Sequence, residues 1–178
     1  MYQEILNFWF QELESKDWFS GDPTLDERIT ERFTDVLDSA AQAELYNWRG
    51  NPHGRLAEII VLDQFSRNVY RNTPRAFAQD PLALALAQEA IAAGADDALN
   101  ADEKSFLYMP FMHSESRRIH EQAMKLFSCP GLEYNYDFEL RHKAIIDRFG
   151  RYPHRNEILG RLSTDEEMAF LQQPGSSF

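Results

Sequence analysis

The stretch from Asn51 to Asp80 carries the most informative pattern of apolar and polar positions in the chain. Asn51 and Pro52 supply an N-cap residue and a first-turn proline, which together predict the start of a helix. The positions that follow are apolar on nearly every side of that helix, and they are Leu56, Ile59, Ile60, Val61, Leu62, Phe65 and Val69. A helix of this kind belongs in the interior of a helical domain.

Charged and amide side chains interrupt this apolar helix. Asp63 and Arg67 are four residues apart on a line begun by two core residues, so they can touch. Gln64 and Asn68 form a second such pair beside it. The arrangement has two interpretations: a buried ion pair that holds the helix to a neighbour, or a pocket wall in which Arg67 binds a carboxylate or phosphate and Asp63 orients it.

Helical patterns recur along the rest of the chain, and no segment gives a convincing strand. Asn100 with Glu103 resembles a capping box, whereas Ser114 and Ser163 are predicted to cap later helices. Besides the central helix, the predicted helices span residues 2–14, 22–37 with a continuation or kink towards 48, 80–93, 100–109, 115–127 and 135–149, followed by a short last one. These patterns predict an all-α fold of stacked antiparallel helical hairpins.

The length of 178 residues suits one domain, so we expect a single all-helical domain over 1–178 with a frayed tail from about residue 172. Hydrophobic residues at 43% and aromatic residues at 13% exclude a disordered chain. Cys129 is the only cysteine, which excludes an intrachain disulfide and a cysteine-based zinc site. The N-terminus has no basic leader and no stretch approaches the roughly 20 apolar residues of a membrane span, so a cytoplasmic protein is expected.

The net charge of −11 argues against nonspecific binding to nucleic acid or to an anionic membrane. Basic residues are nevertheless concentrated in two places. Residues 141–161 contain six basic and two acidic residues, and residues 64–79 contain three arginines and no acid. If the two stretches face each other they form an anion site, and if they face outward they pair with surface acids.

Three ordered blocks of sequence give a family resemblance. The segments LDQFSRNVYRNTPRAFAQDPLAL at 62–84, FLYMPFMHSES at 106–116 and HKAIIDRFGRYPHRNEILGR at 142–161, with ILNFWF at 5–10, resemble the bacterial family named domain of unknown function 924. The resemblance covers nearly the whole chain. It implies a tetratricopeptide-like right-handed superhelix and no established activity. Members often have proline where this chain has Ser66 and glycine where it has Asn72, so the turn near Asn72 can differ in geometry.

Histidines supply the remaining candidate chemistry. His113 and Glu115 follow the proline at position 110, which is expected to end or kink its helix, and backbone amides at the next helix start favour an anion. His142 lies on an apolar helix face, where a hydrogen-bonded core histidine is the common case. His154 and Arg155 lie in a proline-bent segment. Three of these histidines with Glu115 are chemically able to bind zinc or iron, but their spacing matches no ligand motif, so we predict no metal site and no cofactor.

Three hypotheses follow. The preferred one is a binding protein whose inner surface receives a small anionic ligand or an acidic peptide. The second is an enzyme acting on a small anionic substrate, with His113 or His142 as general base and Glu115 or Asp63 as its orienting carboxylate. The third is a protein–protein interaction module, and the oligomeric state stays open. The predicted ligand-binding residues are Asp63, Gln64, Arg67, Asn68, His113, Glu115, His142, Arg148, His154 and Arg155.

Overall fold

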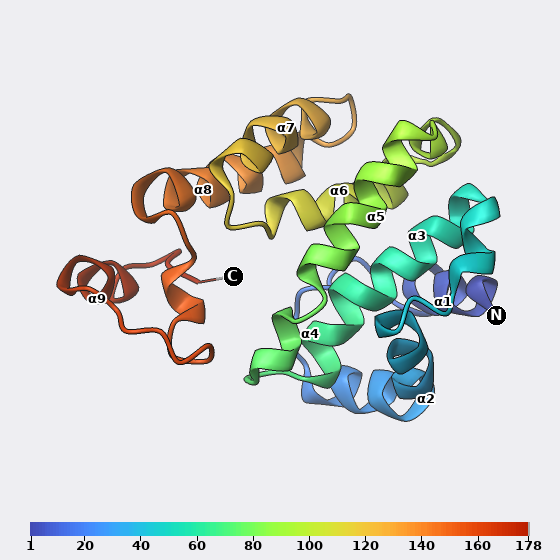
Figure 1. Cartoon of the computed structure of the whole chain (residues 1–178), viewed down its shortest axis with the longest axis horizontal. Coiled ribbons are helices and arrows are strands. Elements are labelled where there is room, and N and C mark those ends of the chain that lie inside the picture. Colours follow the sequence, from blue (N-terminus) through green and yellow to red (C-terminus); the bar gives the residue numbers. More distant parts are fainter. Residues whose placement is uncertain (178) are drawn as a thin grey trace.

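Helices and short helical turns form the whole regular structure of the chain (Figure 1). The computed structural model describes residues 1–177, and no strand occurs among them, which confirms the all-α prediction. The α-helices are α1 (Tyr2–Asn7), α2 (Pro23–Ala41), α3 (Pro52–Ile60), α4 (Ser66–Val69), α5 (Asp80–Ala92), α6 (Ala101–Met112), α7 (Arg117–Phe127), α8 (Glu133–Phe149) and α9 (Asp165–Leu171). The short turns are η1 (Phe8–Glu12), η2 (Tyr46–Gly50), η3 (Val61–Phe65), η4 (Pro74–Phe77), η5 (Ala95–Ala98) and η6 (Pro153–Arg155).

The helix α3 lies at the centre and continues through η3 into α4 without leaving the helical conformation. It packs against α1, α5 and α6, while α2 packs against η3 and α4. The helices α6, α7 and α8 pack one against the next along the chain, as Figure 1 shows from the yellow to the orange segments. From α5 to α8 successive helices are therefore neighbours, which suits stacked hairpins, whereas the superhelical winding stays a prediction.

The central helix is buried on all sides, as its apolar circumference predicts. Leu56, Ile60 and Phe65 have no exposed surface. The ring of Phe65 lies 5.1 Å from that of Phe33 and 5.6 Å from that of Trp9, so aromatic rings from α2 and η1 enclose it. None of the helices in residues 1–177 is both long and apolar enough to cross a membrane.

Several helix ends lie where the sequence places them. The side chain of Asn51 accepts the amide of His53, and Asn100 forms a reciprocal capping box with Glu103. Gly94 and Gly150 take left-handed backbone conformations directly after α5 and α8. These local signals were sufficient because caps and stops act on backbone groups within one helical turn.

Two predicted caps are wrong. Helix α7 begins after Ser116 rather than after Ser114, because the carboxylate of Glu115 accepts the amide of Tyr152 and holds this segment out of the helix. The cap of α9 is Thr164 instead of Ser163, and its reciprocal partner is Glu167. Pro110, which was expected to end or kink its helix, does not end it, since α6 continues for two more residues to Met112.

The two departures from the family pattern have a structural explanation. Asn72 has a φ of 62°, a left-handed conformation that glycine adopts freely and that asparagine tolerates better than most residues. Ser66 is fully buried, and its hydroxyl has no hydrogen-bond partner among the described residues. Glycine therefore suits position 72, and a side chain without a hydroxyl suits position 66.

Gly54 brings the start of α3 into direct contact with the preceding turn η2. A Cβ atom at this position would lie 2.2 Å from the carbonyl oxygen of Trp48, which is backbone and cannot rotate away. We expect Gly54→Ala to lower the free energy of unfolding by about 1–3 kcal/mol, because the two segments must separate. Urea denaturation followed by circular dichroism measures the loss.

Gly50→Ala is the matched control for this substitution, because a Cβ at Gly50 meets nothing within 4 Å. We expect this variant to unfold within about 0.5 kcal/mol of the wild type. Equal destabilisation by the two substitutions would contradict a specific role for the contact at Gly54.

Candidate functional site

The π-helical turn η3 places polar side chains in the middle of the apolar central helix. One extra residue in this turn shifts the register between α3 and α4, a feature that often accompanies functional sites. Asp63 lies in η3 with 1% of its side chain exposed, and Gln64 beside it is also buried. No sequence signal distinguishes this turn from an ordinary α-helix.

Asp63 is the centre of a buried polar cluster. Its Oδ1 atom lies 2.7 Å from Nδ1 of His113 and 3.3 Å from Nη1 of Arg67. Its Oδ2 atom accepts a hydrogen bond of 2.6 Å from Gln64. Burial by itself would raise the pKa of Asp63, but His113 and Arg67 hold this pKa well below its usual range. Asp63 is therefore ionised.

Asp80 at the start of α5 joins two arginines that are distant in sequence. Arg67 donates to both of its carboxylate oxygens, at 2.9 and 3.1 Å. Arg155 approaches the Oδ2 atom at 3.3 Å and donates to the carbonyl oxygen of His113 at 3.0 Å. Two guanidinium groups therefore share the carboxylate of Asp80. The contact of Arg155 with it is longer than those of Arg67.

Arg155 is the least well satisfied member of the cluster. Its side chain is 7% exposed, and its buried Nε atom has no hydrogen-bond partner among the described residues. The guanidinium lies 4.6 Å from the ring centres of both Phe77 and Tyr152. Burial and the nearby charge of Arg67 lower the pKa of Arg155, whereas Asp80 acts in the opposite direction.

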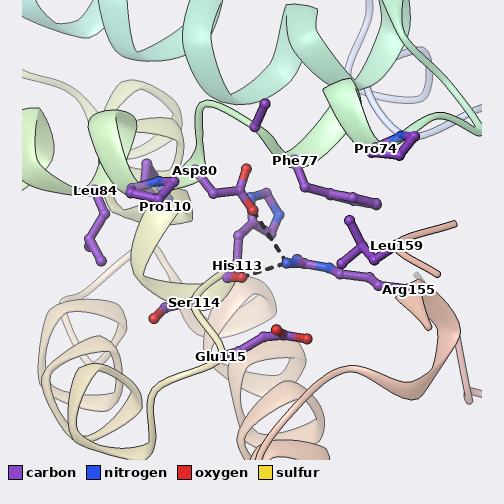
Figure 2. Close-up of a pocket in the computed structure, with 12 residues that line it drawn as sticks. Pro74, Phe77, Asp80, Leu84, Pro110, His113, Ser114, Glu115, Arg155 and Leu159 are labelled. Atoms are coloured by element: carbon purple, nitrogen blue, oxygen red, sulfur yellow. Dashed lines mark hydrogen bonds and ion pairs between the residues drawn. The ribbon is translucent and has the colours of Figure 1, made fainter. Parts of the chain in front are cut away.

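A pocket of about 440 Å³ lies against this cluster (Figure 2). Its apolar walls come mainly from η4, α5 and α6, and include Pro74, Phe77, Pro81, Leu84, Pro110 and Leu159. Its polar lining consists of Asp80, His113, Ser114, Glu115 and Arg155. In Figure 2 the guanidinium of Arg155 extends towards Asp80 and the His113 carbonyl, with Phe77 and Glu115 on either side. The volume is that of a small-molecule site.

Glu115, which lines the pocket, connects two segments of the chain. Arg161 donates to both carboxylate oxygens of Glu115, at 2.7 and 2.9 Å, and the amide of Tyr152 donates to Oε1. The pKa of Glu115 is lowered, since the hydrogen bonds from Arg161 and Tyr152 outweigh burial. These contacts hold the segment that carries Arg155 against the end of α6.

A second buried network lies behind the pocket. His120 and Glu139 are both fully buried, with Nδ1 of His120 2.6 Å from Oε1 of Glu139. Nε2 of His120 lies 2.7 Å from the carbonyl oxygen of Ser114, and the hydroxyl of Tyr152 donates to the carbonyl of Met112. Burial raises the pKa of Glu139. The network ties α7 and α8 to the residues that line the pocket.

The structure brings six of the ten predicted site residues together. Arg67, His113 and Arg155, which come from the three sequence blocks, meet around Asp80, and of these three His113 and Arg155 also line the pocket. The six residues are Asp63, Gln64, Arg67, His113, Glu115 and Arg155. The remaining four lie elsewhere or behind the pocket wall.

Asn68 and Arg148 lie outside the cluster. Asn68 donates to Asp26 on α2, which also binds Arg71. Arg148 is exposed on α8 and pairs with Glu166. The pairing of Arg148 is the outward contact of an arginine with a surface acid that the sequence left as an alternative, whereas Asn68 is buried against α2.

His142 and His154 lie close to Tyr152 and do not line the pocket. His142 is buried, bonds the carbonyl oxygen of Phe138 and has its pKa lowered by burial to about 3. The ring of His154 lies 5.5 Å from that of Tyr152, and burial lowers the pKa of His154 to about 4. Residues 1–177 contain no group of three or more histidine, cysteine or acidic side chains arranged to hold a metal ion.

Several residues that build the site are not predicted from the sequence. Asp80 is predicted only as a helix start, although an acid between two arginine-rich stretches is a usable signal. His120, Glu139, Tyr152 and Arg161 have no predicted role. Nothing in their spacing indicates these contacts, because each joins residues at least nine positions apart.

Comparison with known proteins supports the family resemblance of the sequence blocks. The chain matches the family described as "bacterial protein of unknown function (DUF924)" over residues 5–175. The solved structure of a protein of unknown function from Agrobacterium tumefaciens is similar to this one, with 37% identical residues, a TM-score of 0.92 and 96% of each chain covered. A search of the curated proteins gives no match. The chain therefore belongs to the bacterial DUF924 family, as its sequence blocks predict.

Proposed function

We propose that the protein binds a small anionic ligand with an apolar part, whose anionic group lies beside Arg155 and His113 in the pocket. The observation that carries this proposal is the state of Arg155. A buried guanidinium whose Nε lacks an acceptor costs stability, and a carboxylate or phosphate beside this guanidinium compensates its charge. This is the function that the polar end of the pocket supports best.

The apolar walls support the second half of the proposal. Proline, phenylalanine and leucine side chains, among them Phe77, Pro81 and Leu84, line the space beyond the charged end. Such walls favour a hydrocarbon or aromatic group over a strongly hydrated one. The volume of about 440 Å³ suits a ligand of this kind better than a long acidic peptide.

Arg155→Met tests the anion site, because methionine keeps much of the apolar stem and removes the charge. We expect affinity for an aryl or alkyl carboxylate such as phenylacetate to fall by about 10–100-fold, the loss of a hydrogen bond to a charged group. Isothermal titration calorimetry measures the change, after a thermal-shift screen of carboxylates and phosphate monoesters on the wild type.

Arg148→Met is the matched control, since Arg148 is exposed and pairs with Glu166. We expect it to bind as the wild type does. Phenylacetamide, which is neutral and of nearly the same shape as phenylacetate, is expected to bind at least tenfold more weakly. The proposal is wrong if no anion of the screen binds at millimolar concentration, or if both arginine variants bind equally.

A second candidate is an enzyme in which His113 is a general base. The distance of 2.7 Å between Asp63 and Nδ1 of His113 favours it, because a buried carboxylate in this position fixes the tautomer with a basic Nε2. Ligands found in the screen are incubated in D₂O and examined by NMR for exchange next to the carboxylate. Exchange that disappears in His113→Asn would support catalysis, whereas equal exchange in both proteins would exclude this role.

A further inference from the structure

The charges around the pocket balance before any ligand enters. Asp63 and Asp80 carry two negative charges, and Arg67 and Arg155 carry two positive ones. Glu115 is neutralised by its two-point contact with Arg161. An anion that enters this cluster brings a net negative charge into a buried site, which is costly unless a positive charge comes with it.

His113 is the group placed to supply that charge. Its Nδ1 atom is engaged by the ionised Asp63, so this nitrogen carries the proton of the neutral ring. Its Nε2 atom has no hydrogen-bond partner within residues 1–177, 15% of the side chain is exposed, and His113 lines the pocket. The free Nε2 is therefore an acceptor, and an incoming anion needs a donor at this place.

Charged and titratable groups from several elements face His113. Asp63 of η3 and Asp80 of α5 favour the charged ring, whereas Arg67 of α4 disfavours it. Arg155 of η6 contacts the backbone oxygen of His113. His142 of α8 and His154 of η6 interact electrostatically with His113 from the far side. Without a ligand, burial and Arg67 lower the pKa of His113, so the ring is neutral at pH 7.

We propose that the pocket binds a monocarboxylate together with one proton. His113 takes up this proton at Nε2, keeps it, and donates a hydrogen bond from Nε2 to the bound carboxylate. This proposal rests on the proposed function and narrows it to a weak acid that is bound with its charge compensated. Asp63 keeps the imidazolium oriented from behind, and Arg155 binds the carboxylate from the side of Phe77. No covalent bond of the ligand changes.

Proton uptake has a direct consequence for affinity. Between the pKa of His113 in the free protein and its higher pKa in the complex, each pH unit is expected to weaken monocarboxylate binding by about tenfold, because one proton accompanies each ligand. Below the pKa of the free protein the affinity becomes independent of pH, because His113 is then protonated before the ligand binds. The pocket would therefore collect weak acids at mildly acidic pH and release them at alkaline pH.

Calorimetry of phenylacetate binding to the wild-type protein tests this at pH 7 and 8, in Tris and in triethanolamine. These buffers are cationic and differ in ionisation enthalpy, so the difference in observed heat counts the protons taken up. We expect between about 0.5 and 1 proton per ligand at pH 7, and a dissociation constant several-fold larger at pH 8.

His113→Asn is the second measurement, because asparagine keeps a donor near Nδ1 for Asp63 and cannot become charged. We expect it to bind phenylacetate at least tenfold more weakly at pH 7, with no proton uptake and no dependence on pH. If this variant does not fold, the wild-type heats still decide. Phenylacetate binding without proton uptake overturns this inference and leaves the proposed anion site intact, whereas the absence of any anion binding overturns both.

Discussion

Replacing Asp63 by alanine is expected to lower the free energy of unfolding by about 3–5 kcal/mol, the typical cost of removing one partner from a buried ion pair. The substitution leaves His113 without the acceptor of its Nδ1 proton and Gln64 without its nearest oxygen. It also removes one of the two carboxylates that compensate Arg67. Urea denaturation at pH 7.5, followed by circular dichroism, measures the effect.

Asp38→Ala is the matched control for this substitution. Asp38 also faces an arginine, Arg75, but at 3.9 Å and with 53% of its side chain exposed. We expect a loss below about 1 kcal/mol, because solvent screens the pair. Asp63→Asn, which keeps the shape and the hydrogen-bonding oxygen, is expected to lie between the two alanine variants. If Asp63→Ala is as stable as Asp38→Ala, the buried cluster contributes nothing to the fold.

Acidification is expected to destabilise the protein already between pH 6.5 and pH 5, a range above the usual pKa of carboxylates. The pKa values of His142 and His154 are lowered by burial to about 3 and about 4, whereas an unfolded histidine titrates near 6.5. Between these values the unfolded chain binds protons that the folded chain does not. Stability is therefore fully present above pH 6.5 and is lost as the pH falls towards 4 and then 3.

The size of this effect follows from the pKa differences. A pH of 5 is about 1.5 units below the pKa of an unfolded histidine, so each of the two histidines lowers the free energy of unfolding by about 2 kcal/mol at this pH. The lowered pKa of His113 acts in the same direction. Glu139 acts in the opposite direction, since its raised pKa lets the folded state hold a proton above pH 4.5. We expect a net loss of about 2–4 kcal/mol between pH 7.5 and pH 5.

Urea denaturation at pH 7.5, 6.5, 5.5 and 5 checks this expectation. In His142→Gln, which cannot titrate, we expect the drop between pH 7.5 and pH 5 to shrink by about 2 kcal/mol, even where the variant is less stable overall. A free energy of unfolding that stays constant over this range would contradict the assignment of a neutral, buried His142.

Part of the candidate site could be predicted from the sequence, and individual residues show which contacts could not. Asp63 and Arg67 lie one turn apart on a helix, so their contact follows from local geometry. His113 and Arg155 were suggested by their chemistry and by the family blocks, but their distances to Asp63 and Asp80 depend on how α5, α6 and η6 pack. Asn68 and Arg148 carry suitable side chains on helix faces that turn away from the pocket.

The sequence by itself determined the elements of this protein: the all-helical class, the buried central helix, most of the helix ends and the family. The first three depend on periodicity, capping or composition within a few turns of the chain, which are local properties, whereas the family follows from the resemblance of whole sequence blocks. Only the tertiary structure decided that Asp80 joins Arg67 to Arg155, that His120 pairs with Glu139, and that Arg155 keeps an unpartnered nitrogen beside a pocket. These features depend on side-chain packing between distant segments, and no spacing along the chain encodes them.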